Sequence, residues 1–240
     1  MSRLKGVLRD PLLTVVMPVF NELATVEEVI RRVVALPVRT QLVVVDDCST
    51  DGTSELLARL APELRFTLLR QSTNQGKGAA LRRGFDLVQG DLVVIQDADL
   101  EYSPEELPEL TSLICEGRAD VVYGSRFLGR HRVFMFTHYL GNLALTFMTN
   151  VLYNTMLTDM ETCYKVMRAE VLRSMTLESN GFGIEPELTA KIFKRRYRVY
   201  EVPISYNGRT YAEGKKIGLK DAFQALWTII RFSRWTPPAA

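Results

Sequence analysis

Cysteine is scarce in this sequence, and its three cysteines are widely spaced. Cys48, Cys115 and Cys163 are odd in number and lie far apart, which fits neither a disulfide framework nor the paired ligands of a zinc site. The cytosol is therefore the expected compartment. The early apolar run 12–20 leads into Asn21 without a small-residue cleavage site, so it is expected to be a first strand.

The net charge is also small, and the sequence has no long apolar run without polar interruptions. The formal charge of +2 is too low for nucleic-acid binding driven by the field of the whole molecule. The longest apolar segment, 133–157, is interrupted by His138, Asn142, Asn150 and Asn154. Polar residues at that frequency match a lipid-exposed span poorly. We therefore expect an interfacial or groove-lining helix there.

Length and composition predict one main domain with a C-terminal extension. The 240 residues, 47% of them hydrophobic, are enough for a sizeable α/β core. We place a catalytic domain at 1–218 and an amphipathic helix with a tail at 219–240. One face of the helix predicted at 219–235 carries Leu219, Ala222, Phe223, Leu226 and Ile230. Membrane contact and packing on the domain or another subunit are equally open for it, and the oligomeric state stays open.

The rest of the chain alternates between strand and helix patterns. Strands are predicted at 13–19, 41–45, 66–69, 92–95 and 120–123, and helices from Thr25, at 53–61, at 77–88 and after Ser103. Capping boxes are predicted at Thr25 and Ser103, and an apolar helix face at Val26, Val29, Ile30 and Val33. Such alternation predicts a mostly parallel sheet with helices on both faces.

An acidic segment follows the strand at 92–95. In an extended chain, Asp97, Asp99 and Glu101 point the same way and offer several oxygens to one cation. Oxygen ligands favour Mg²⁺ or Mn²⁺ over zinc. A solvated turn that caps the next helix is the alternative, but the predicted cap at Ser103 makes the three carboxylates unnecessary for that purpose. The segment therefore predicts a metal site.

Polar groups from four strands are expected to meet at one edge of the sheet, because ligands in parallel sheets lie at the carboxyl ends of the strands. These ends carry residues 21–22, 46–47, 97–101 and 124–126. Cations for a metal-bound diphosphate are available at Arg126, Arg209, Lys215 and Lys216. The Gly-rich stretch 74–80 lacks the Walker spacing and is interpreted as a close helix start, with Lys77 as a further candidate for the nucleotide site.

Three motifs in order resemble family 2 glycosyltransferases with the GT-A fold. They are Met-Pro-Val-Phe-Asn-Glu at 17–22, Val-Asp-Asp-Cys-Ser-Thr-Asp-Gly-Thr at 45–53 and Asp-Ala-Asp at 97–99. Segments 122–127, 158–165, 202–206 and 209–217 are similar to dolichyl- or polyprenyl-phosphate mannosyltransferases. The resemblance covers roughly residues 12–218 and implies a nucleotide-diphospho-sugar transferase.

The resemblance also implies a set of site residues. The base and ribose pocket would be lined by Pro18, Phe20, Glu22, Val45 and Asp47. The nucleotide-sugar site would further include Lys77, Asp97, Ala98 and Lys215. The metal ligands would be Asp97, Asp99 and Glu101, the catalytic residues Asp99, Arg126, Asp159 and Arg209, and the acceptor-phosphate residues Arg126 and His138.

The implied reaction is inverting transfer of mannose or glucose from GDP-mannose or UDP-glucose to a polyprenyl phosphate, by an enzyme lying on the cytoplasmic face of a membrane. A lipid phosphate is already anionic, so it needs no general base and can displace the diphosphate in one step. A glycolipid or polysaccharide hydroxyl would need a base, for which Asp159, Glu161 and His138 are candidates. Residues 207–216 fit a mobile lid with two glycines and three cations.

Two other classes are less consistent with these residues. A nucleotidyltransferase would also use an acidic metal site, but it usually has an N-terminal Gly-rich loop, which residues 17–22 do not provide. A non-catalytic binding protein of the same fold remains compatible with fold alone. It is expected to have lost part of the acidic segment or the basic loop, and both are present.

Overall fold

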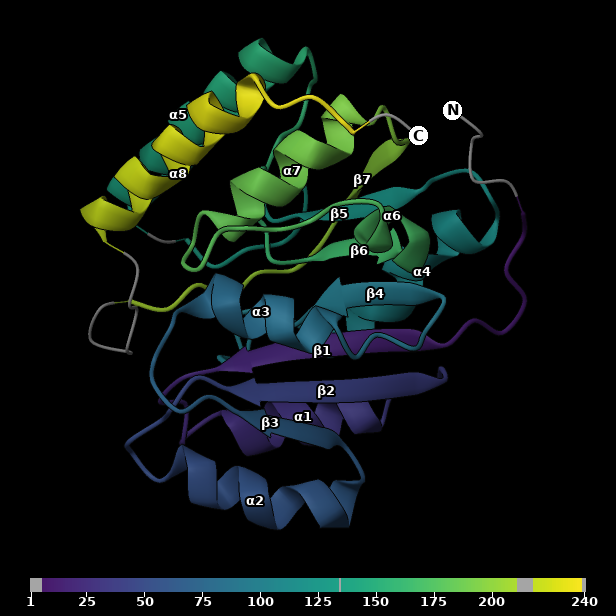
Figure 1. Ribbon diagram of the computed structural model, residues 1–240, viewed down its shortest axis with the longest axis vertical. Coiled ribbons are helices and arrows are strands. Elements are labelled where there is room, and N and C mark those ends of the chain that lie inside the picture. Colours follow the sequence, from purple (N-terminus) through teal and green to yellow (C-terminus); the bar gives the residue numbers. More distant parts are fainter. Residues whose placement is uncertain (1–5, 134, 211–217, 239–240) are drawn as a thin grey trace.

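The computed structural model describes residues 6–133, 135–210 and 218–238, and within them seven strands form one sheet (Figure 1). The strands are β1 (Leu13–Val19), β2 (Thr40–Asp46), β3 (Thr67–Arg70), β4 (Leu92–Ile95), β5 (Val121–Ser125), β6 (Lys165–Arg168) and β7 (Val199–Pro203). Their order across the sheet is β3-β2-β1-β4-β6-β5-β7.

The sheet is parallel except at β6. This strand pairs antiparallel with β4 on one side and with β5 on the other, whereas β1 pairs parallel with β2 and β4. The mostly parallel sheet predicted from the alternating pattern is therefore confirmed. The reversed strand at Lys165–Arg168 was not predicted, because four buried residues carry no periodicity that reveals strand direction.

Helices cover both faces of the sheet, as predicted. They are α1 (Val26–Val34), α2 (Thr53–Leu64), α3 (Lys77–Phe85), α4 (Leu107–Cys115), α5 (Phe136–Tyr153), α6 (Ala169–Arg173), α7 (Ile184–Lys194) and α8 (Leu219–Ser233), with a short 3₁₀ turn, η1, at Pro104–Glu106. Helix α3 packs on β1 and β2, in front of the sheet in Figure 1, and α4 packs on β5 and β6 behind it.

The core lies between the central strands and the helix faces that cover them. The predicted inner face of α1, made of Val26, Val29, Ile30 and Val33, is fully buried. Burying one such aliphatic side chain stabilises the fold by about 1.5–3 kcal/mol relative to leaving it exposed. The core thereby fixes the strands whose carboxyl ends carry the polar residues.

Several predicted helix boundaries and caps are wrong. Helix α2 continues past Ala61 to Leu64 with Pro62 inside it, and α3 ends three residues before the predicted Val88. Neither predicted capping box forms. The Thr25 hydroxyl instead donates to the Ala98 carbonyl at 2.8 Å, and Glu106 accepts from the Ser205 amide at 2.8 Å. Long-range partners thus replace the local caps.

Helices α5 and α8 pack side by side above the sheet (Figure 1). The Tyr153 hydroxyl on α5 donates to the Ile229 carbonyl on α8 at 2.7 Å. Ala225, Ile229 and Phe232 form the buried side of α8. Among the described residues, the structure has no helix with the length and apolarity needed to cross a bilayer.

Part of the apolar face predicted for the C-terminal helix lies on its outer side, whereas Ala222 and Leu226 are half-buried. Phe223 is 71% exposed and Ile230 is 41% exposed, and Trp227 beside them is 64% exposed. Helix α8 is therefore apolar on two sides, with one side on the protein and the other in solvent.

Candidate functional site

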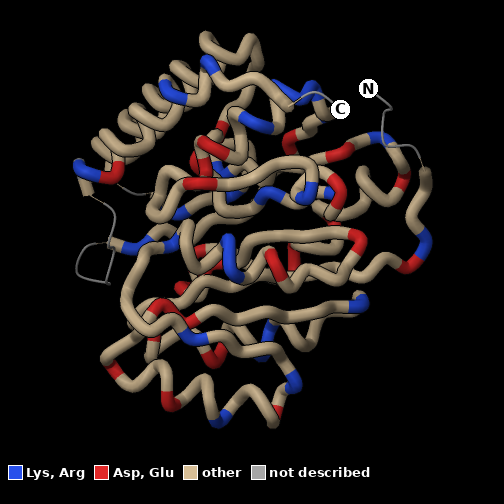
Figure 2. The backbone as a smooth tube through the Cα atoms, in the orientation of Figure 1, with Lys and Arg blue, Asp and Glu red and all other residues tan. Residues whose placement is uncertain are grey.

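Polar residues from separate strands meet at the carboxyl edge of the sheet, as predicted. Strands β1, β2 and β4 run parallel and adjacent, so Glu22, Asp47 and Asp97 all follow strand ends on the same side. Figure 2 shows acidic and basic positions close together in this part of the molecule. The site is therefore built where a parallel sheet places its ligands.

Arg209 lies at the centre of three carboxylates. Its Nη2 atom is 2.8 Å from Asp99 Oδ2 and its Nη1 atom 3.1 Å from Glu22 Oε2. Glu101 Oε1 accepts from the Arg209 amide at 2.7 Å and lies 3.7 Å from its Nε. Its Nη2 atom also donates to Glu22 Oε1 at 3.3 Å, so the guanidinium forms a long two-point fork with Glu22 while it is shared with Asp99.

The acidic segment is bent, which differs from the extended chain that the sequence suggested. Leu100 adopts a φ of 61°, in the left-handed region. The bend brings the Glu101 amide to Asp99 Oδ1 at 3.2 Å. Alternation along a strand therefore does not explain why Asp99 and Glu101 share a cation; a local turn does.

The crowding of like charges shows in the acidity of Asp99. Burial first, and then the charges of Asp97 and Glu101, raise the pKa of Asp99 to about 7, although Arg209 opposes the rise. A cation bound between these carboxylates removes the same repulsion.

Asp97 is paired with a different cation, Lys77. The Lys77 ammonium lies 2.8 Å and 2.9 Å from the two oxygens of Asp97 and 3.4 Å from Glu185 Oε1. Burial by itself would lower the pKa of Lys77, but the negative charges, Asp97 foremost, hold that pKa well above its usual value. Lys77 is therefore a charged group at the site, as the sequence suggested.

The donor set at this edge suits a hard divalent cation. Asp97, Asp99 and Glu101 offer carboxylate oxygens, the ligands that Mg²⁺ and Mn²⁺ prefer. In the described part of the chain, however, no three acidic, histidine or cysteine side chains are arranged as a ready-made metal cage. The carboxylates are engaged by Lys77 and Arg209 instead. The residues fit a divalent ion in chemistry, provided that the two cations give way.

The residues predicted for the base and ribose pocket lie beside this acidic segment. Pro18 on β1 pairs in register with the fully buried Val45 on β2. Asp47 accepts from the Gln75 and Gly76 amides at 2.8 Å and 2.7 Å. Asp47 therefore fixes the Gly-rich turn that leads into α3.

Two other predicted pocket residues have clear positions. Phe20, just after β1, is partly buried. Ala98 is buried, and its carbonyl accepts the Thr25 hydroxyl, which also donates to Glu22 Oε2 at 3.1 Å. The first and third motifs are thus linked by hydrogen bonds.

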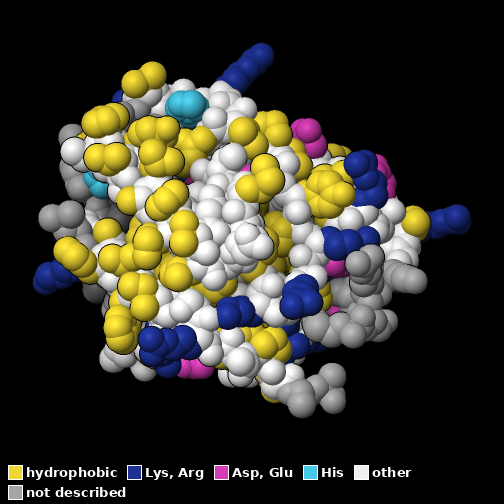
Figure 3. Space-filling view, turned by 90° about the horizontal axis from the view of Figure 1, so that it is seen from above, with side chains coloured by type: hydrophobic (Ala, Val, Ile, Leu, Met, Phe, Trp, Pro, Cys, Tyr) yellow, Lys and Arg dark blue, Asp and Glu magenta, His cyan; other side chains and the backbone are white. Residues whose placement is uncertain are grey.

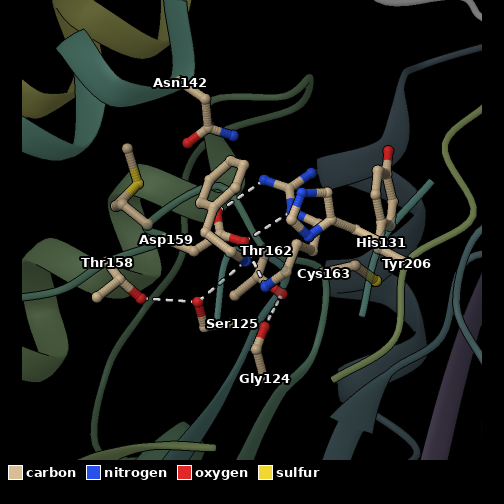
Figure 4. A network of polar contacts seen from close by, with 12 residues as sticks. Gly124, Ser125, His131, Asn142, Thr158, Asp159, Thr162, Cys163 and Tyr206 are labelled. Carbon is tan, nitrogen blue, oxygen red and sulfur yellow. Dashed lines mark hydrogen bonds and ion pairs between the residues drawn. The ribbon is translucent and has the colours of Figure 1, made fainter. Parts of the chain in front are cut away.

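A second arginine, Arg126, forms a closed fork with Asp159, which is labelled in Figure 4. Its Nε and Nη2 donate to the two oxygens of Asp159, each at 2.7 Å, and its own amide donates to the same carboxylate at 3.0 Å. Asp159 is fully buried. The Arg126 guanidinium also lies 5.1 Å from the Tyr206 ring centre. Burial opposes the charge of Arg126, but Asp159 outweighs it and holds the arginine pKa well above its usual value.

Helix α5 supports the segment that carries Asp159. Asn150 exchanges two hydrogen bonds with Leu157, both at 2.8 Å, and the Thr146 hydroxyl accepts from the Met160 amide at 3.1 Å. In Figure 4, Asn142 of the same helix lies above this network. Helix α5 therefore holds the backbone on both sides of Asp159.

The remaining predicted site residues are less directly connected. His138 lies in the first turn of α5 and is partly buried. Lys215 and Lys216, and most of the predicted lid, lie outside the described residues, so their roles stay predictions.

Sequence reasoning assigned no role to several residues that hold the site together. The Tyr206 hydroxyl donates to Glu101 Oε2 at 2.7 Å. Glu201 accepts from the Thr158 amide at 2.9 Å, and Glu185 lies between Lys77 and Lys165. In the sequence, Glu185 looks like an ordinary acidic residue of a first helical turn, so no local signal distinguishes it.

Comparison with known proteins gives consistent matches. The sequence model of the family described as "Glycosyl transferase family 2" matches residues 14–176. A dolichol-phosphate mannosyltransferase from Pyrococcus furiosus is 30% identical over 235 residues, covering 92% of this chain and 64% of the relative. An undecaprenyl-phosphate mannosyltransferase from Micrococcus luteus is 31% identical over 212 residues, covering 85% of this chain and 86% of the relative. The chain thus spans less than two thirds of the first relative's length.

A solved structure shows the same fold. Glucosyl-3-phosphoglycerate synthase from Mycobacterium tuberculosis, crystallised with Mn²⁺, UDP and glucosyl-3-phosphoglycerate, superposes with a TM-score of 0.73 at 22% identity. The match covers 93% of this chain and 80% of the synthase. This likeness confirms the predicted fold class.

Proposed function

The chain belongs to glycosyl transferase family 2, and from that premise we propose that it transfers a hexose from a nucleotide-diphosphate sugar to a polyprenyl phosphate. The observation that carries the proposal is the charge arrangement at the carboxyl edge of the sheet. Three carboxylates at 97–101 are balanced by Lys77 and Arg209. Such a site can exchange its internal ion pairs for a divalent ion and the diphosphate that the ion accompanies.

The proposed reaction is a single displacement at the anomeric carbon. An oxygen of the acceptor phosphate forms the new bond, and the bond to the nucleoside diphosphate breaks with its electrons going to the diphosphate. The configuration inverts, and no proton has to be removed from an acceptor that is already anionic. Mg²⁺ or Mn²⁺, held by Asp97, Asp99 and Glu101, supplies neutralising charge for the leaving group when bound.

The cations of the chain have separate roles in this scheme. Arg209 and Lys77 leave their carboxylates and bind phosphate oxygens or a neighbouring carboxylate, while Glu22 and Asp47 stay with the nucleoside side. Arg126 is held through Nε and Nη2 by Asp159, so its Nη1 donors can face the acceptor phosphate. Asp159 is then a positioning residue for Arg126, and His138 is placed on the acceptor side with it.

A hydroxyl acceptor is the second candidate, and one observation favours it. Burial raises the pKa of Glu161 to about 7, with Lys165 and Arg126 opposing the rise, and a carboxylate of that pKa suits a general base near neutral pH. Asp159 is a poorer base, because both of its oxygens are engaged by Arg126.

Nucleotide release from a panel of donors tests the proposal. GDP-mannose, UDP-glucose, UDP-galactose and UDP-N-acetylglucosamine are each incubated with Mn²⁺ or Mg²⁺, with and without a short polyprenyl phosphate. The expected result is release from one donor that needs both the metal and the lipid phosphate. Metal-dependent donor binding without lipid-stimulated release would reject the lipid-phosphate acceptor and favour the hydroxyl.

The Glu161→Gln variant separates the two acceptors. An anionic phosphate needs no base, so lipid-stimulated release by this variant is expected to stay within about threefold of the wild type. If the acceptor is a hydroxyl, loss of a general base lowers turnover by about 10²–10⁴-fold.

The outer face of α5 and α8 is proposed to lie on the membrane that holds the acceptor. Helix α5 has no Asp, Glu, Lys or Arg within Phe136–Tyr153, and the charged positions of α8 lie towards its two ends (Figure 2), at Lys220 and Asp221 and at Arg231. Phe136, Phe147 and Trp227 are 71%, 63% and 64% exposed, and hydrophobic side chains gather over this part of the surface in Figure 3. Because α5 also supports the Asp159 segment, this face brings the lipid surface to the Arg126 fork. We place it at the cytoplasmic leaflet.

Vesicle sedimentation tests the membrane face. The double variant Phe223→Glu/Trp227→Glu is expected to reduce binding to phosphatidylcholine–phosphatidylglycerol vesicles by about tenfold or more. Leu87→Glu, at a similarly apolar but isolated exposed position after α3, is the control and should bind as the wild type does. Equal partitioning of all three proteins would reject the membrane face.

A further inference from the structure

Lys77 lies between two carboxylates at the start of α3. Its ammonium contacts both oxygens of Asp97, and Glu185 Oε1 on α7 lies 3.4 Å from it. The Lys77 side chain is 14% exposed and the Glu185 side chain is 4% exposed. A charge in such a position needs a partner at all times, because an unpaired buried ammonium is costly.

The two oxygens of Glu185 have different surroundings. Oε2 lies 2.6 Å from the ammonium of Lys165, which is itself fully buried and anchors the carboxylate. Oε1 is buried, and within the described chain it has no hydrogen-bond partner; the Lys77 ammonium is the cation that faces it. This oxygen therefore accepts no hydrogen bond, although the Lys77 ammonium lies within ion-pair distance of it at 3.4 Å.

The backbones that carry Lys77 and Glu185 are fixed against each other. The Ala79 amide donates to the Asn180 carbonyl at 2.9 Å. A Cβ atom added at Gly78 would lie 2.3 Å from the Ser179 carbonyl oxygen, and one at Gly76 would lie 2.6 Å from that of Asn180. The Gly-rich stretch therefore lets α3 begin directly on the loop that leads into α7, so a movement of the Lys77 side chain alone can bring its ammonium to Glu185.

We infer that Glu185 is a positioning residue that takes over the Lys77 ammonium when Asp97 is released to bind a ligand at the acidic segment. The inference rests on the proposed function, since it assumes that Asp97 binds a metal. Lys165 keeps Glu185 in place, so the ammonium moves and the carboxylate does not. Glu185 thus lowers the cost of freeing Asp97 without touching the substrate.

Binding of Mn²⁺ alone, followed by electron paramagnetic resonance, tests this role apart from activity. Glu185→Gln is expected to raise the dissociation constant for Mn²⁺ about tenfold, a usual size for coupling between sites. Lys77→Met removes the ion that competes for Asp97 and should lower the constant. In the Lys77→Met background, Glu185→Gln should change the constant by less than about twofold.

Glu187→Gln is the matched control. Glu187 is a fully buried carboxylate on the same helix that contacts Lys191 at 2.5 Å and accepts from the Glu178 and Ser179 amides, and among the described residues no ion pair joins it to Lys77. Its Mn²⁺ affinity should equal that of the wild type, and thermal melting checks the folding of every variant. If Glu185→Gln does not fold, Glu185→Asp keeps the charge for Lys165 but shortens the side chain, and a smaller loss of affinity is expected.

The outcomes separate the inference from the proposed function. Unchanged affinity in Glu185→Gln, or an equal loss with and without Lys77, overturns the role of Glu185 while the metal site stands. Absence of Mn²⁺ binding by the wild type, with and without GDP or UDP, overturns the metal site and the inference together.

Discussion

The arginines at the two halves of the site are held with different tightness. Arg126 forms a two-point fork with the fully buried Asp159, and both contacts are 2.7 Å long. Arg209 is divided among Glu22, Asp99 and Glu101 at distances from 2.8 to 3.7 Å, and its buried Nε has no hydrogen-bond partner in the described chain.

This difference indicates that the Arg126–Asp159 pair is a permanent structural contact, whereas the ion pairs of Arg209 can be exchanged for contacts with a ligand. A closed fork satisfies both partners, so releasing Arg126 would leave a buried carboxylate without its cation. Arg209 loses less on leaving, because its fork with Glu22 is longer, at 3.1 and 3.3 Å, and the Glu22 side chain is less buried than that of Asp159. The half around Arg126, the proposed acceptor half, is therefore fixed by its own residues, whereas the half around Arg209, the proposed donor half, holds its internal cation less tightly.

Removing Asp159 is expected to have the largest effect on stability, and it tests whether the Arg126 fork is a structural contact. Asp159→Ala leaves Arg126 buried without its counter-charge and is expected to lower the free energy of unfolding by about 3–5 kcal/mol. Chemical denaturation measures the loss. Asp120→Ala is the matched control, because Asp120 forms the same fork with Arg198, whose side chain is 31% exposed. Its loss should be smaller, and equal losses would contradict the importance of burial.

Arg209→Ala probes the exchangeable half. The expected result is a fall in turnover of about 10²–10³-fold, the size seen when one donor to a developing negative charge is removed. The free energy of unfolding should change by less than about 1 kcal/mol. Arg118→Ala, with a side chain that is 59% exposed, serves as the control and should keep full turnover. Normal turnover in Arg209→Ala would remove the donor role.

The half of the site around Arg126 should also make stability depend on pH, because Glu161 lies two residues after Asp159. Its pKa is raised from 4.5 to about 7, so the folded state binds a proton more tightly than the unfolded state. Stability is then highest below about pH 4.5 and falls as the pH rises to about 7, by about 1–3 kcal/mol for this group. Glu161→Gln lacks this titrating group, so between pH 4.5 and about 7 its stability should fall less than that of the wild type by this amount, as measured by thermal melts. Parallel stability curves for the two proteins would refute the raised pKa of Glu161.

The smallest expected effect concerns Tyr206, which touches both halves. Its hydroxyl donates to Glu101, and its ring lies over Arg126. Tyr206→Phe keeps the ring and removes one hydrogen bond, so stability should fall by about 0.5–1.5 kcal/mol. Denaturation measures this change, while Tyr206→Ala should lose more because the ring contact goes too. If Tyr206→Phe lost more stability than Tyr206→Ala, the contribution of Tyr206 could not be divided into a hydrogen bond and a ring contact.

Local patterns predicted what depends on neighbouring residues. The strands that end before Glu22, Asp47 and Asp97 are visible as apolar runs, and their parallel arrangement follows from the intervening helices. The meeting of these residues at one edge is then a matter of geometry. The metal assignment and the roles within the site stay predictions.

Long-range contacts account for what the sequence did not reveal. The bend at Leu100 breaks the alternation of side chains along residues 97–101. It requires a left-handed backbone conformation, which an apolar residue in the sequence does not indicate. Thr25 and Glu106 occupy cap positions but bond to distant segments. Glu185 acquires its place because the loop at 179–181, which leads into α7, packs on the start of α3, so no spacing in the sequence connects it with Lys77.

The reversed strand β6 has a consequence for how this protein can diversify. Because β5 and β6 are antiparallel neighbours, the Gly124 amide meets the Tyr164 carbonyl at 2.8 Å, so the chain leaves and re-enters the sheet at one point. The segment between β5 and β6, which contains Arg126, α5 and Asp159, is therefore an insert whose two ends lie next to each other. Such an insert can change in length and character without shifting the register of a strand. The strands that precede Glu22, Asp47 and Asp97 are thereby insulated from exchange of this insert.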